Sequence, residues 1–385
     1  MASLLRQQTM RRLSSPLVRA WCHHRHRHVG GASGRSLRQF SQGADAAPSG
    51  IWDAIRQAVD TTINDEEHVG LLSRHQVLGW TYEELYQRAL GVALGLSSLG
   101  VDADGRVLVC VDKNDSEKLL VQLGAPIAGV DVVVVDDPAH LVQAQEETNC
   151  TALIISPTNF MFFEDIADLP STFELPPIVT GPVRTPPNDT GKPPVVLSFV
   201  ELIAEVAAAP REELEEIADM LLDTELKHDD QTQLFFQNPH SATFALQPVV
   251  ESQLVSEGKR LADLVQMQES DRVLIGTALG STFGMASVLA AAQTGAGLVL
   301  TNIDPEPLSA DAPPKSAPEQ ITVLSTLHDT KCSLLVSDDM RFHNIALPMP
   351  QVHDISSLRG GLVRGDPDSG LSYVYAGIQF ETAAV

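Results

Sequence analysis

The sequence predicts an α/β protein built from Rossmann-like βαβ subdomains with mostly parallel sheets. Short runs of β-branched and other apolar residues, such as 106–111 and 130–135, alternate with segments of helical periodicity. Apart from Arg106 and Asp131, these runs are apolar, which is typical of parallel strands covered by helices on both faces. With 385 residues, the chain is long enough for more than one such unit.

The order of elements is clearest in the first half of the chain. Thr81 followed by Glu84 predicts a capping box at the start of a helix, and Gly100 ends that helix. The predicted helices cover residues 51–63, 81–99, 116–128 and 139–148, and the predicted strands cover 106–111, 130–135 and 152–156. This alternation predicts consecutive βαβ units.

The first 40 residues differ in composition from the rest of the chain. They contain eight arginines, and the first acidic residue is Asp45. An amphipathic, arginine-rich start without acids predicts a mitochondrial transit peptide, cut after Phe40. The protein is then expected in the mitochondrial matrix or on the matrix side of the inner membrane. The His- and Arg-rich tract 23–28 falls in the removed segment, so we do not assign it as a metal site.

Acidic residues dominate the charge of the chain. Fifty Asp and Glu residues face 26 Lys and Arg, a formal net charge of −24. Removing the eight arginines of the transit peptide leaves 18 basic residues and a net charge of −32. Such a surface repels nucleic-acid phosphates and anionic lipid headgroups, so we expect no nucleic-acid partner, whereas a basic protein partner is compatible.

Two other classes of protein are excluded by the sequence pattern. No apolar run approaches the ~20 residues of a membrane-spanning helix, so we expect a protein that is not transmembrane. The four cysteines are scattered and form no CxxC pair, and the late histidines fit no metal template. We therefore expect neither a metal site nor a disulfide framework.

The chain divides into four expected parts. They are a transit peptide (1–40), an N-terminal extension (41–79), a first α/β subdomain (80–232) and a second, truncated α/β subdomain (233–385). Proline pairs mark surface connections in the first subdomain. Residues 210–226 predict an acidic helix with one apolar stripe. This helix is either an ordinary surface helix or a docking helix for a basic partner.

An ordered series of short motifs resembles a known family. Three stretches carry the likeness: Trp80–Leu85 (WTYEEL), Leu99–Val107 (LGVDADGRV) and Gly124–Gly129 (GAPIAG). In this order they are similar to the opening of adenylate-forming acyl-CoA synthetases. Later matches are Leu197–Leu202, Asp271–Leu274, Ser356–Arg359 and Gly365–Pro367. The resemblance implies the fold of the family's large N-terminal domain, without the C-terminal lid domain that carries a catalytic lysine.

The resemblance also implies where ATP phosphates would be held. The family has a loop rich in Ser, Thr and Gly that ends in Pro-Lys-Gly. The matching loop here, 237–246, keeps Ser241 and Thr243 as hydroxyl donors but has Ala245 in place of the lysine. Its glycine positions carry residues with a Cβ atom, one of them proline, which hinders close approach of the backbone. Each lost charge-assisted bond costs about 1.5–3 kcal/mol, so we expect no tight phosphate binding.

Two further family positions are changed. Ser281 stands where the resemblance places a histidine that positions the acyl chain. Near the C-terminus, Glu381 matches the magnesium-binding glutamate of the family's Tyr-Gly-x-Thr-Glu turn, and Phe380 replaces the threonine that meets the AMP phosphate. Ser241, Thr243 and Glu381 are therefore the residual candidates for cofactor binding, and we assign no catalytic residue.

Other catalytic motifs are missing from the sequence. It contains no GxSxG elbow, no HExxH helix and no Walker lysine. The glycines at 276, 280 and 284 predict close backbone packing in preference to a cofactor loop.

Two functions remain open. The substituted phosphate loop and the missing lid favour a pseudoenzyme, a non-catalytic acyl-CoA synthetase-like protein without a cofactor. It would act as a structural or accessory subunit among other mitochondrial subunits, in the respiratory chain, ATP synthase or ribosome. The alternative is a divergent mitochondrial acyl-CoA or carboxylate ligase that uses ATP, Mg²⁺ and CoA, or a protein that binds acyl or adenylate (AMP) ligands.

Overall fold

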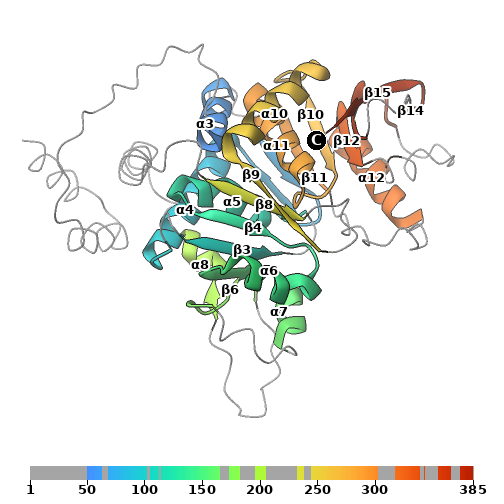
Figure 1. Cartoon of the computed structure of the whole chain (residues 1–385). Helices are drawn as coiled ribbons and strands as arrows, with labels where there is room; N and C mark the ends of the chain where they lie inside the picture. The colour runs from blue at the N-terminus through green and yellow to red at the C-terminus, as the bar shows by residue number, and fades with distance from the viewer. Residues whose placement is uncertain are drawn as a thin grey trace, which may run out of the picture.

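The computed structural model describes twelve stretches of the chain. They are residues 50–62, 68–101, 105–111, 114–164, 173–182, 196–204, 232–237, 244–301, 317–338, 342, 354–365 and 373–384. The predicted transit peptide, the acidic helix 210–226, Ser241 and Thr243 lie outside these residues. The described part contains two mostly parallel sheets with helices packed on them (Figure 1), which confirms the predicted α/β class.

The first sheet has seven strands in the order β7-β6-β5-β3-β4-β8-β9. Their bounds are β3 Arg106–Cys110, β4 Asp131–Val134, β5 Ala152–Ile155, β6 Ile178–Val179, β7 Leu197–Ser198, β8 Gln233–Gln237 and β9 Leu246–Val250. All neighbouring strands are parallel except β8 and β9, which form an antiparallel hairpin. The three strands predicted between residues 106 and 156 are confirmed.

The second sheet has eight strands in the order β14-β15-β13-β12-β10-β11-β1-β2. Their bounds are β1 Leu71–Ser73, β2 Leu78–Trp80, β10 Arg272–Gly276, β11 Gly297–Leu300, β12 Leu334–Asp338, β13 Gly360–Arg364, β14 Tyr373–Tyr375 and β15 Ile378–Ala383. Hairpins β1–β2 and β14–β15 are antiparallel, and the other neighbours are parallel.

Two strands pair with a sheet on the other side of a boundary that the sequence predicts between parts of the chain. Hairpin β1–β2 comes from the expected N-terminal extension, yet β1 pairs with β11 of the second sheet, with Leu71 opposite Leu298. Strand β8 lies after the expected boundary at residue 233, yet it pairs with β4 of the first sheet. Each sheet is therefore completed by strands that are distant in the sequence from its other members.

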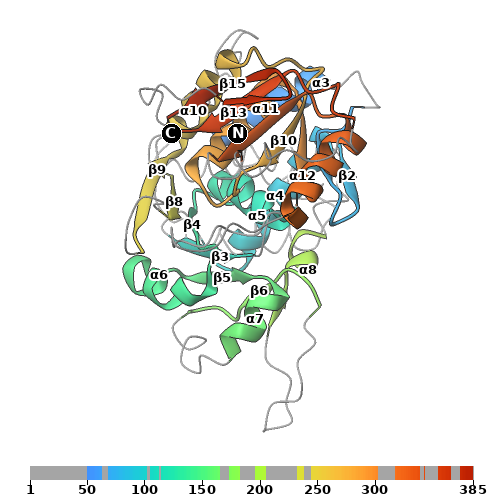
Figure 2. The ribbon, with the colours of Figure 1, turned by 90° about the vertical axis from the view of Figure 1, so that its right-hand side faces the viewer.

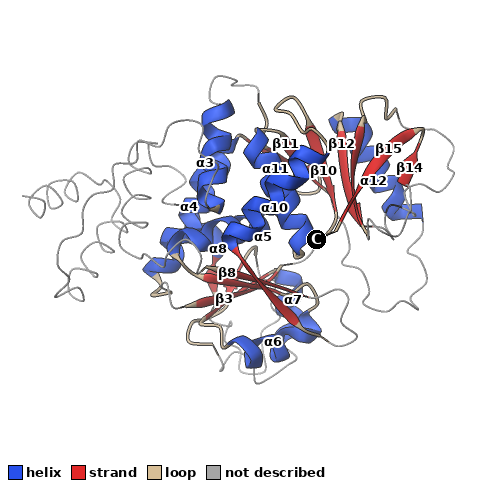
Figure 3. Cartoon of the chain, turned by 45° about the horizontal axis from the view of Figure 1, so that its top comes forward, coloured by secondary structure: helices blue, strands red, loops and turns tan. Residues whose placement is uncertain are grey.

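The helices form one layer between the sheets and two layers outside them. Their bounds are α3 Ile51–Thr62, α4 Tyr82–Ser98, α5 Ser116–Gly124, η1 Ala125–Ala128, η2 Pro138–His140, α6 Leu141–Thr148, α7 Pro157–Glu164, α8 Phe199–Ala204, α10 Glu251–Leu264, α11 Thr282–Thr294 and α12 Ala317–Thr330. In the view of Figure 2, α6 and α7 lie on the lower side of the first sheet. Figure 3 shows α4, α5, α10 and α11 between the two sheets. None of the described helices is long and apolar enough to span a bilayer.

One cluster of buried side chains occupies the layer between the sheets. It contains residues of both sheets, such as Val107 and Leu298, together with residues of helices α3, α4, α5, α10 and α11. Helix α3 packs against both α4 and α11, and Trp52 of α3 stacks on Tyr86 of α4 with ring centroids 4.2 Å apart. Two smaller clusters lie on the outer faces, under α6 and α12.

Helix α4 begins at the predicted capping box. The Thr81 hydroxyl accepts a hydrogen bond from the Glu84 amide, and the Glu84 carboxylate accepts one from the Thr81 amide. Gly100, just after the helix, has a φ of 83°, a conformation that glycine adopts without strain. These residues are therefore used to start and end the helix, as the sequence predicts.

Each sheet contains one βαβαβ unit, and the two units have the same strand order. The units are β3-α5-β4-α6-β5 and β10-α11-β11-α12-β12. Arg106 at the start of β3 donates a hydrogen bond to the carbonyl oxygen of Thr148 (2.9 Å). Arg272 at the start of β10 makes the same bond to Thr330 (3.0 Å). In both units an arginine thus ties the central strand to the end of the helix that crosses back over it.

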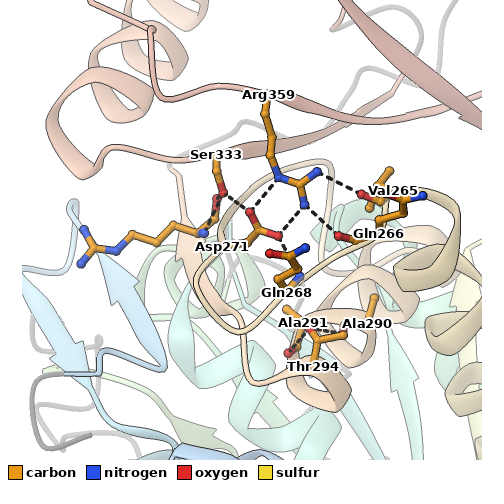
Figure 4. A network of polar contacts seen from close by, with 10 residues as sticks. Val265, Gln266, Gln268, Asp271, Ala290, Ala291, Thr294, Ser333 and Arg359 are labelled. Carbon is orange, nitrogen blue, oxygen red and sulfur yellow. Dashed lines mark hydrogen bonds and ion pairs between the residues drawn. The ribbon is translucent and has the colours of Figure 1, made fainter.

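An ion pair joins the amino ends of three strands in the second sheet (Figure 4). Asp271, before β10, accepts bonds from Nε and Nη2 of Arg359, before β13, at 2.9 and 2.6 Å. Asp271 also accepts bonds from the Ser333 hydroxyl (2.7 Å) and the Gln268 amide (2.8 Å). Burial alone would raise the pKa of Asp271, but these bonds outweigh burial and hold the pKa below its ordinary value.

The predicted close packing around the glycines is confirmed. A Cβ atom at Gly276 would lie 2.6 Å from the carbonyl oxygen of Val336 on β12. A Cβ atom at Gly284 would lie 2.1 Å from the carbonyl oxygen of Ala278. Both positions therefore require glycine because a neighbouring backbone approaches too closely for any side chain.

We expect the ion pair of Asp271 to stabilise the protein at neutral pH and less in acid. Because the folded-state pKa is lowered, the stabilisation is complete above the ordinary carboxyl pKa of about 4 and is lost as pH falls through the folded value. Asp271→Asn should lower the free energy of unfolding at pH 7 by about 2 kcal/mol. Urea denaturation at a series of pH values should show this difference shrinking below pH ~4. A difference that is independent of pH would contradict the assignment.

Val77 provides a second stability prediction. It lies in the turn of hairpin β1–β2 with a φ of 53°, and its side chain is 90% exposed. A β-branched residue is strained in this region, and no packing is lost on its removal. Val77→Gly should therefore raise the free energy of unfolding by about 1 kcal/mol. The matched control is Val200→Gly, at an exposed position of helix α8, which should lower it by a similar amount. Thermal denaturation of both variants measures the difference in sign.

Candidate functional site

The carboxyl ends of the two central strands meet. From β3 the chain moves to β4 on one side and returns to β5 on the other, and β10 has the same relation to β11 and β12. In open α/β sheets, ligands bind beyond the carboxyl ends of strands at such switch points. Here residues after β3 and residues after β10 are hydrogen-bonded to each other. This candidate site, which we call the polar junction, consists of Asn114, Lys118, Gln122, Asp136 and the segment 277–281.

Two amides hold the segment 277–281 to the first sheet. The Asn114 side chain donates to the carbonyl oxygen of Thr277 (2.8 Å) and accepts from the amide of Leu279 (3.0 Å). Gln122 of α5 donates to the carbonyl oxygen of Leu279 (3.0 Å). Asn114 is 2% exposed and Gln122 is fully buried, so these bonds are shielded from water. The three bonds satisfy the Asn114 amide and the backbone groups of Thr277 and Leu279, whereas Oε1 of Gln122 has no partner among the described residues.

An ion pair between a buried lysine and a partly buried aspartate lies beside these amides. Lys118 of α5 is 2% exposed, and its Nζ atom lies 2.6 Å from Oδ1 of Asp136, which follows β4. A Cβ atom at Gly280 would lie 2.5 and 2.6 Å from the two carboxylate oxygens of Asp136. The carboxylate is therefore in direct contact with the backbone of segment 277–281.

Ser281 forms the start of α11. Its hydroxyl accepts a hydrogen bond from the amide of Gly284 (3.0 Å) and donates one to the carbonyl oxygen of Ala278 (2.7 Å). The resemblance places the acyl-positioning histidine at this position. The serine hydroxyl is instead engaged in capping the helix.

A second ion pair closes the carboxyl edge of the second sheet. Asp338 at the end of β12 accepts a hydrogen bond from the Thr277 hydroxyl (3.0 Å). It also forms an ion pair with Arg364 at the end of β13 (2.9 Å). The side chains of Asp338 and Arg364 are 6% and 18% exposed. Arg364 is therefore already neutralised by an acid.

Strand β8 runs parallel to β4, so it ends at the carboxyl edge of the first sheet. The segment between β8 and β9 contains the predicted phosphate contacts Ser241 and Thr243, which lie outside the described residues. The description of the chain resumes at Phe244, whose ring stacks on His140 with centroids 4.6 Å apart. The predicted roles of Ser241 and Thr243 remain predictions.

Glu381 lies in a strand, whereas the resemblance implies a turn. The turn of this hairpin is at Ala376 and Gly377, and Glu381 stands opposite Leu362 within β15. Its side chain is exposed. Phe380 beside it is 3% exposed and packs edge-on against Phe342 with centroids 4.8 Å apart. The residue that replaces the phosphate-binding threonine is thus part of an apolar core.

Neither thiols nor metal ligands form a site in the part of the chain that the structure describes. Burial raises the pKa of Cys150 to about 12 and that of Cys332 to about 11, so both thiols stay protonated and unreactive at neutral pH. No group of three or more His, Cys, Asp or Glu side chains among the described residues is placed to hold a metal ion.

Sequence reasoning missed the residues of the polar junction. Asn114 and Leu279 are far apart in the sequence, and no local pattern connects them. One signal was available for Lys118 and Gln122, which stand four residues apart on α5 with only apolar residues between them. Polar residues at that spacing share one helix face, which predicts a buried polar contact.

We expect Asn114→Ala to loosen the junction between the sheets. The substitution removes two hydrogen bonds and leaves the amide of Leu279 and the carbonyl of Thr277 buried without a partner. The free energy of unfolding should fall by about 2–4 kcal/mol, and the Leu279 amide should exchange with solvent faster than in wild type. Gln143→Ala, on the exposed surface of α6, should change neither quantity. Unchanged exchange at Leu279 would contradict the assigned bond.

Comparisons with known proteins were made for sequence and for structure. No protein-family model matches the chain, and no curated protein sequence matches it. Solved structures do match it. Anthranilate CoA ligase AuaEII, solved with anthranoyl-AMP, has a TM-score of 0.64 and 17% identity, over 85% of this chain and 56% of that chain. The N-terminal domain of FACL13 from Mycobacterium tuberculosis has a TM-score of 0.59 and 13% identity, over 83% and 70% of the two chains.

A third match is MbtA from Mycobacterium smegmatis, with a TM-score of 0.59 and 18% identity, over 84% of this chain and 53% of that chain. The chain thus spans between 53% and 70% of the length of these three structures. The matched parts include the N-terminal domain of FACL13, in agreement with the two parallel sheets described above. The chain has the fold of the large N-terminal domain of acyl-CoA ligases and related adenylation enzymes.

Proposed function

We propose that this protein is a non-catalytic relative of the acyl-CoA ligases that serves as a structural or accessory subunit of a mitochondrial protein complex. The observation that carries the proposal is the polar junction. At the place where an open α/β sheet would receive its ligand, the side chains of this protein are bonded to one another and to the backbone.

The electrostatics of the carboxyl edges support the absence of adenylation. Adenylation requires positive charge preorganised around a developing negative charge on phosphorus. In the polar junction, Lys118 is paired with Asp136, and on the second sheet Arg364 is paired with Asp338. Asp137 adds a further exposed carboxylate next to Asp136. Among the described residues, these two cations, Lys118 and Arg364, are therefore already paired with acids.

The family positions that are changed in the sequence support the same proposal. Ser281 is used to cap α11, and Phe380 is part of the core under α12. The loop position that carries lysine in the family is Ala245. Residues that serve ligands in the family thus serve folding in this chain.

The subcellular site and the partners rest on the sequence. The arginine-rich, acid-free start favours import into mitochondria, to the matrix or the matrix side of the inner membrane. The net charge of −24 favours basic surfaces on neighbouring subunits. Respiratory-chain complexes, ATP synthase and the ribosome are hosts of the right kind.

One observation favours a second function, which is a divergent acyl-CoA or carboxylate ligase or a protein that binds acyl or adenylate ligands. The fold is that of ligases, and one similar structure was solved with anthranoyl-AMP. This function would require ATP, Mg²⁺ and CoA, with Ser241, Thr243 and Glu381 as the contacts that the resemblance assigns.

An adenylation assay separates the two functions. Purified protein with ATP, Mg²⁺ and a panel of carboxylates should show no exchange of pyrophosphate into ATP above a no-protein blank. The matched control is Glu381→Ala, which should give the same background. Turnover by the wild-type protein that Glu381→Ala abolishes would overturn the proposed function.

Sedimentation of mitochondrial extract tests the proposed assembly. In a gradient at moderate salt, the protein should migrate with a large complex, because a subunit is held by its partners. Raised salt should shift it toward lighter fractions, since acidic surfaces bind basic partners less tightly when charges are screened. Migration as a species no larger than the 41.5 kDa chain at both salt concentrations would count against a subunit role.

A further inference from the structure

The ion pair of Lys118 and Asp136 lies between two parts of the fold. Lys118 of α5 is 2% exposed, and the side chain of Asp136, which follows β4 of the first sheet, is 19% exposed. The carboxylate of Asp136 touches Gly280, which lies between β10 of the second sheet and α11. Taking the ammonium group of Lys118 out of water costs free energy that a simple apolar contact would not, so a pair in this place calls for a specific reason.

The carboxylate of Asp136 lies against the backbone in the manner of a bound anion. Its two oxygens would be 2.5 and 2.6 Å from a Cβ atom at Gly280, so the absence of a side chain at this residue makes room for them. Gly280 immediately precedes Ser281, the N-cap of the 13-residue helix α11, and the amino end of a helix favours negative charge. The ammonium group of Lys118 supplies the counter-charge at 2.6 Å.

Two side-chain amides hold the backbone beside this carboxylate. Gln122 lies on α5 with Lys118, Asn114 precedes that helix, and both bond to segment 277–281. The junction therefore offers one ammonium group and a fixed backbone approach made possible by glycine.

We propose that Asp136 is a built-in anion that fills a carboxylate-binding position between Lys118 and the amino end of α11. In this protein the position is occupied by a side chain of the chain itself, which shuts the junction to small carboxylate ligands. This proposal goes beyond the absence of catalysis, because it assigns a position, a chemical class and the residue that blocks it.

Chemical rescue tests the proposal. Asp136→Gly removes the carboxylate and leaves the space next to Lys118 open. The variant should have a lower Tm than wild type, and sodium formate should restore about half or more of the loss by mass action, while sodium chloride at equal ionic strength should not. Wild type and Asp137→Gly, which removes the neighbouring exposed carboxylate, should show no formate-specific shift. The double variant Lys118→Met/Asp136→Gly should lose the rescue.

Two results would overturn the proposal. One is a formate response of Asp136→Gly no larger than that of Asp137→Gly. The other uses Asp136→Asn, which keeps the shape of the side chain and removes its charge, and so stays informative even if the glycine variant does not fold. A Tm of Asp136→Asn equal to that of wild type would show that no anion is needed at this position. Adenylation by the wild-type protein would refute the proposed function but would leave the formate result unchanged.

Discussion

The structure depends on one apolar layer that both sheets share. The inner faces of the two sheets and the helices between them contribute to a single cluster of buried side chains. A fully buried aliphatic side chain contributes about 1.5–3 kcal/mol by leaving water, so this layer supplies most of the free energy that holds the sheets together. That layer fixes the position of the polar groups of the junction. Their ion pair and amide bonds can be formed only because the apolar contacts already bring β3 and β10 end to end.

Much of this fold could be predicted because its signals are local. Strands β3, β4 and β5 are apolar runs after Arg106 and Asp131 at the starts of β3 and β4, and the capping box of Thr81 and Glu84 is visible within four residues. The motifs that carry the family resemblance include Asp271 and Arg359, and these two residues form the ion pair at the amino ends of the second sheet. What the sequence shares with acyl-CoA ligases is therefore in part a set of contacts that stabilise the fold.

The rest could not be predicted because it depends on residues that meet only in three dimensions. Nothing near Leu71 indicates that its partner strand is β11, so residues 41–79 read as an extension. Asn114 and Leu279 follow strands of different sheets. Gly280 makes room for the carboxylate of Asp136, a residue distant from it in the sequence. The candidate contacts Ser241 and Thr243 remain predictions from the resemblance. The resemblance implies a turn at Glu381, whereas this part of the chain forms β15.

The place of hairpin β1–β2 has a consequence for the order in which the chain folds. The hairpin is synthesised before the whole of the first sheet, yet β11, the strand it pairs with, is synthesised after that sheet is complete. Domains generally fold from the N-terminus as they leave the ribosome, and a contact this distant in sequence forms late. The apolar face of helix α3 and the edge of the hairpin must therefore wait for their partners. During synthesis, the segment from Ile51 to Trp80 is where we expect chaperones to bind and mispairing to begin.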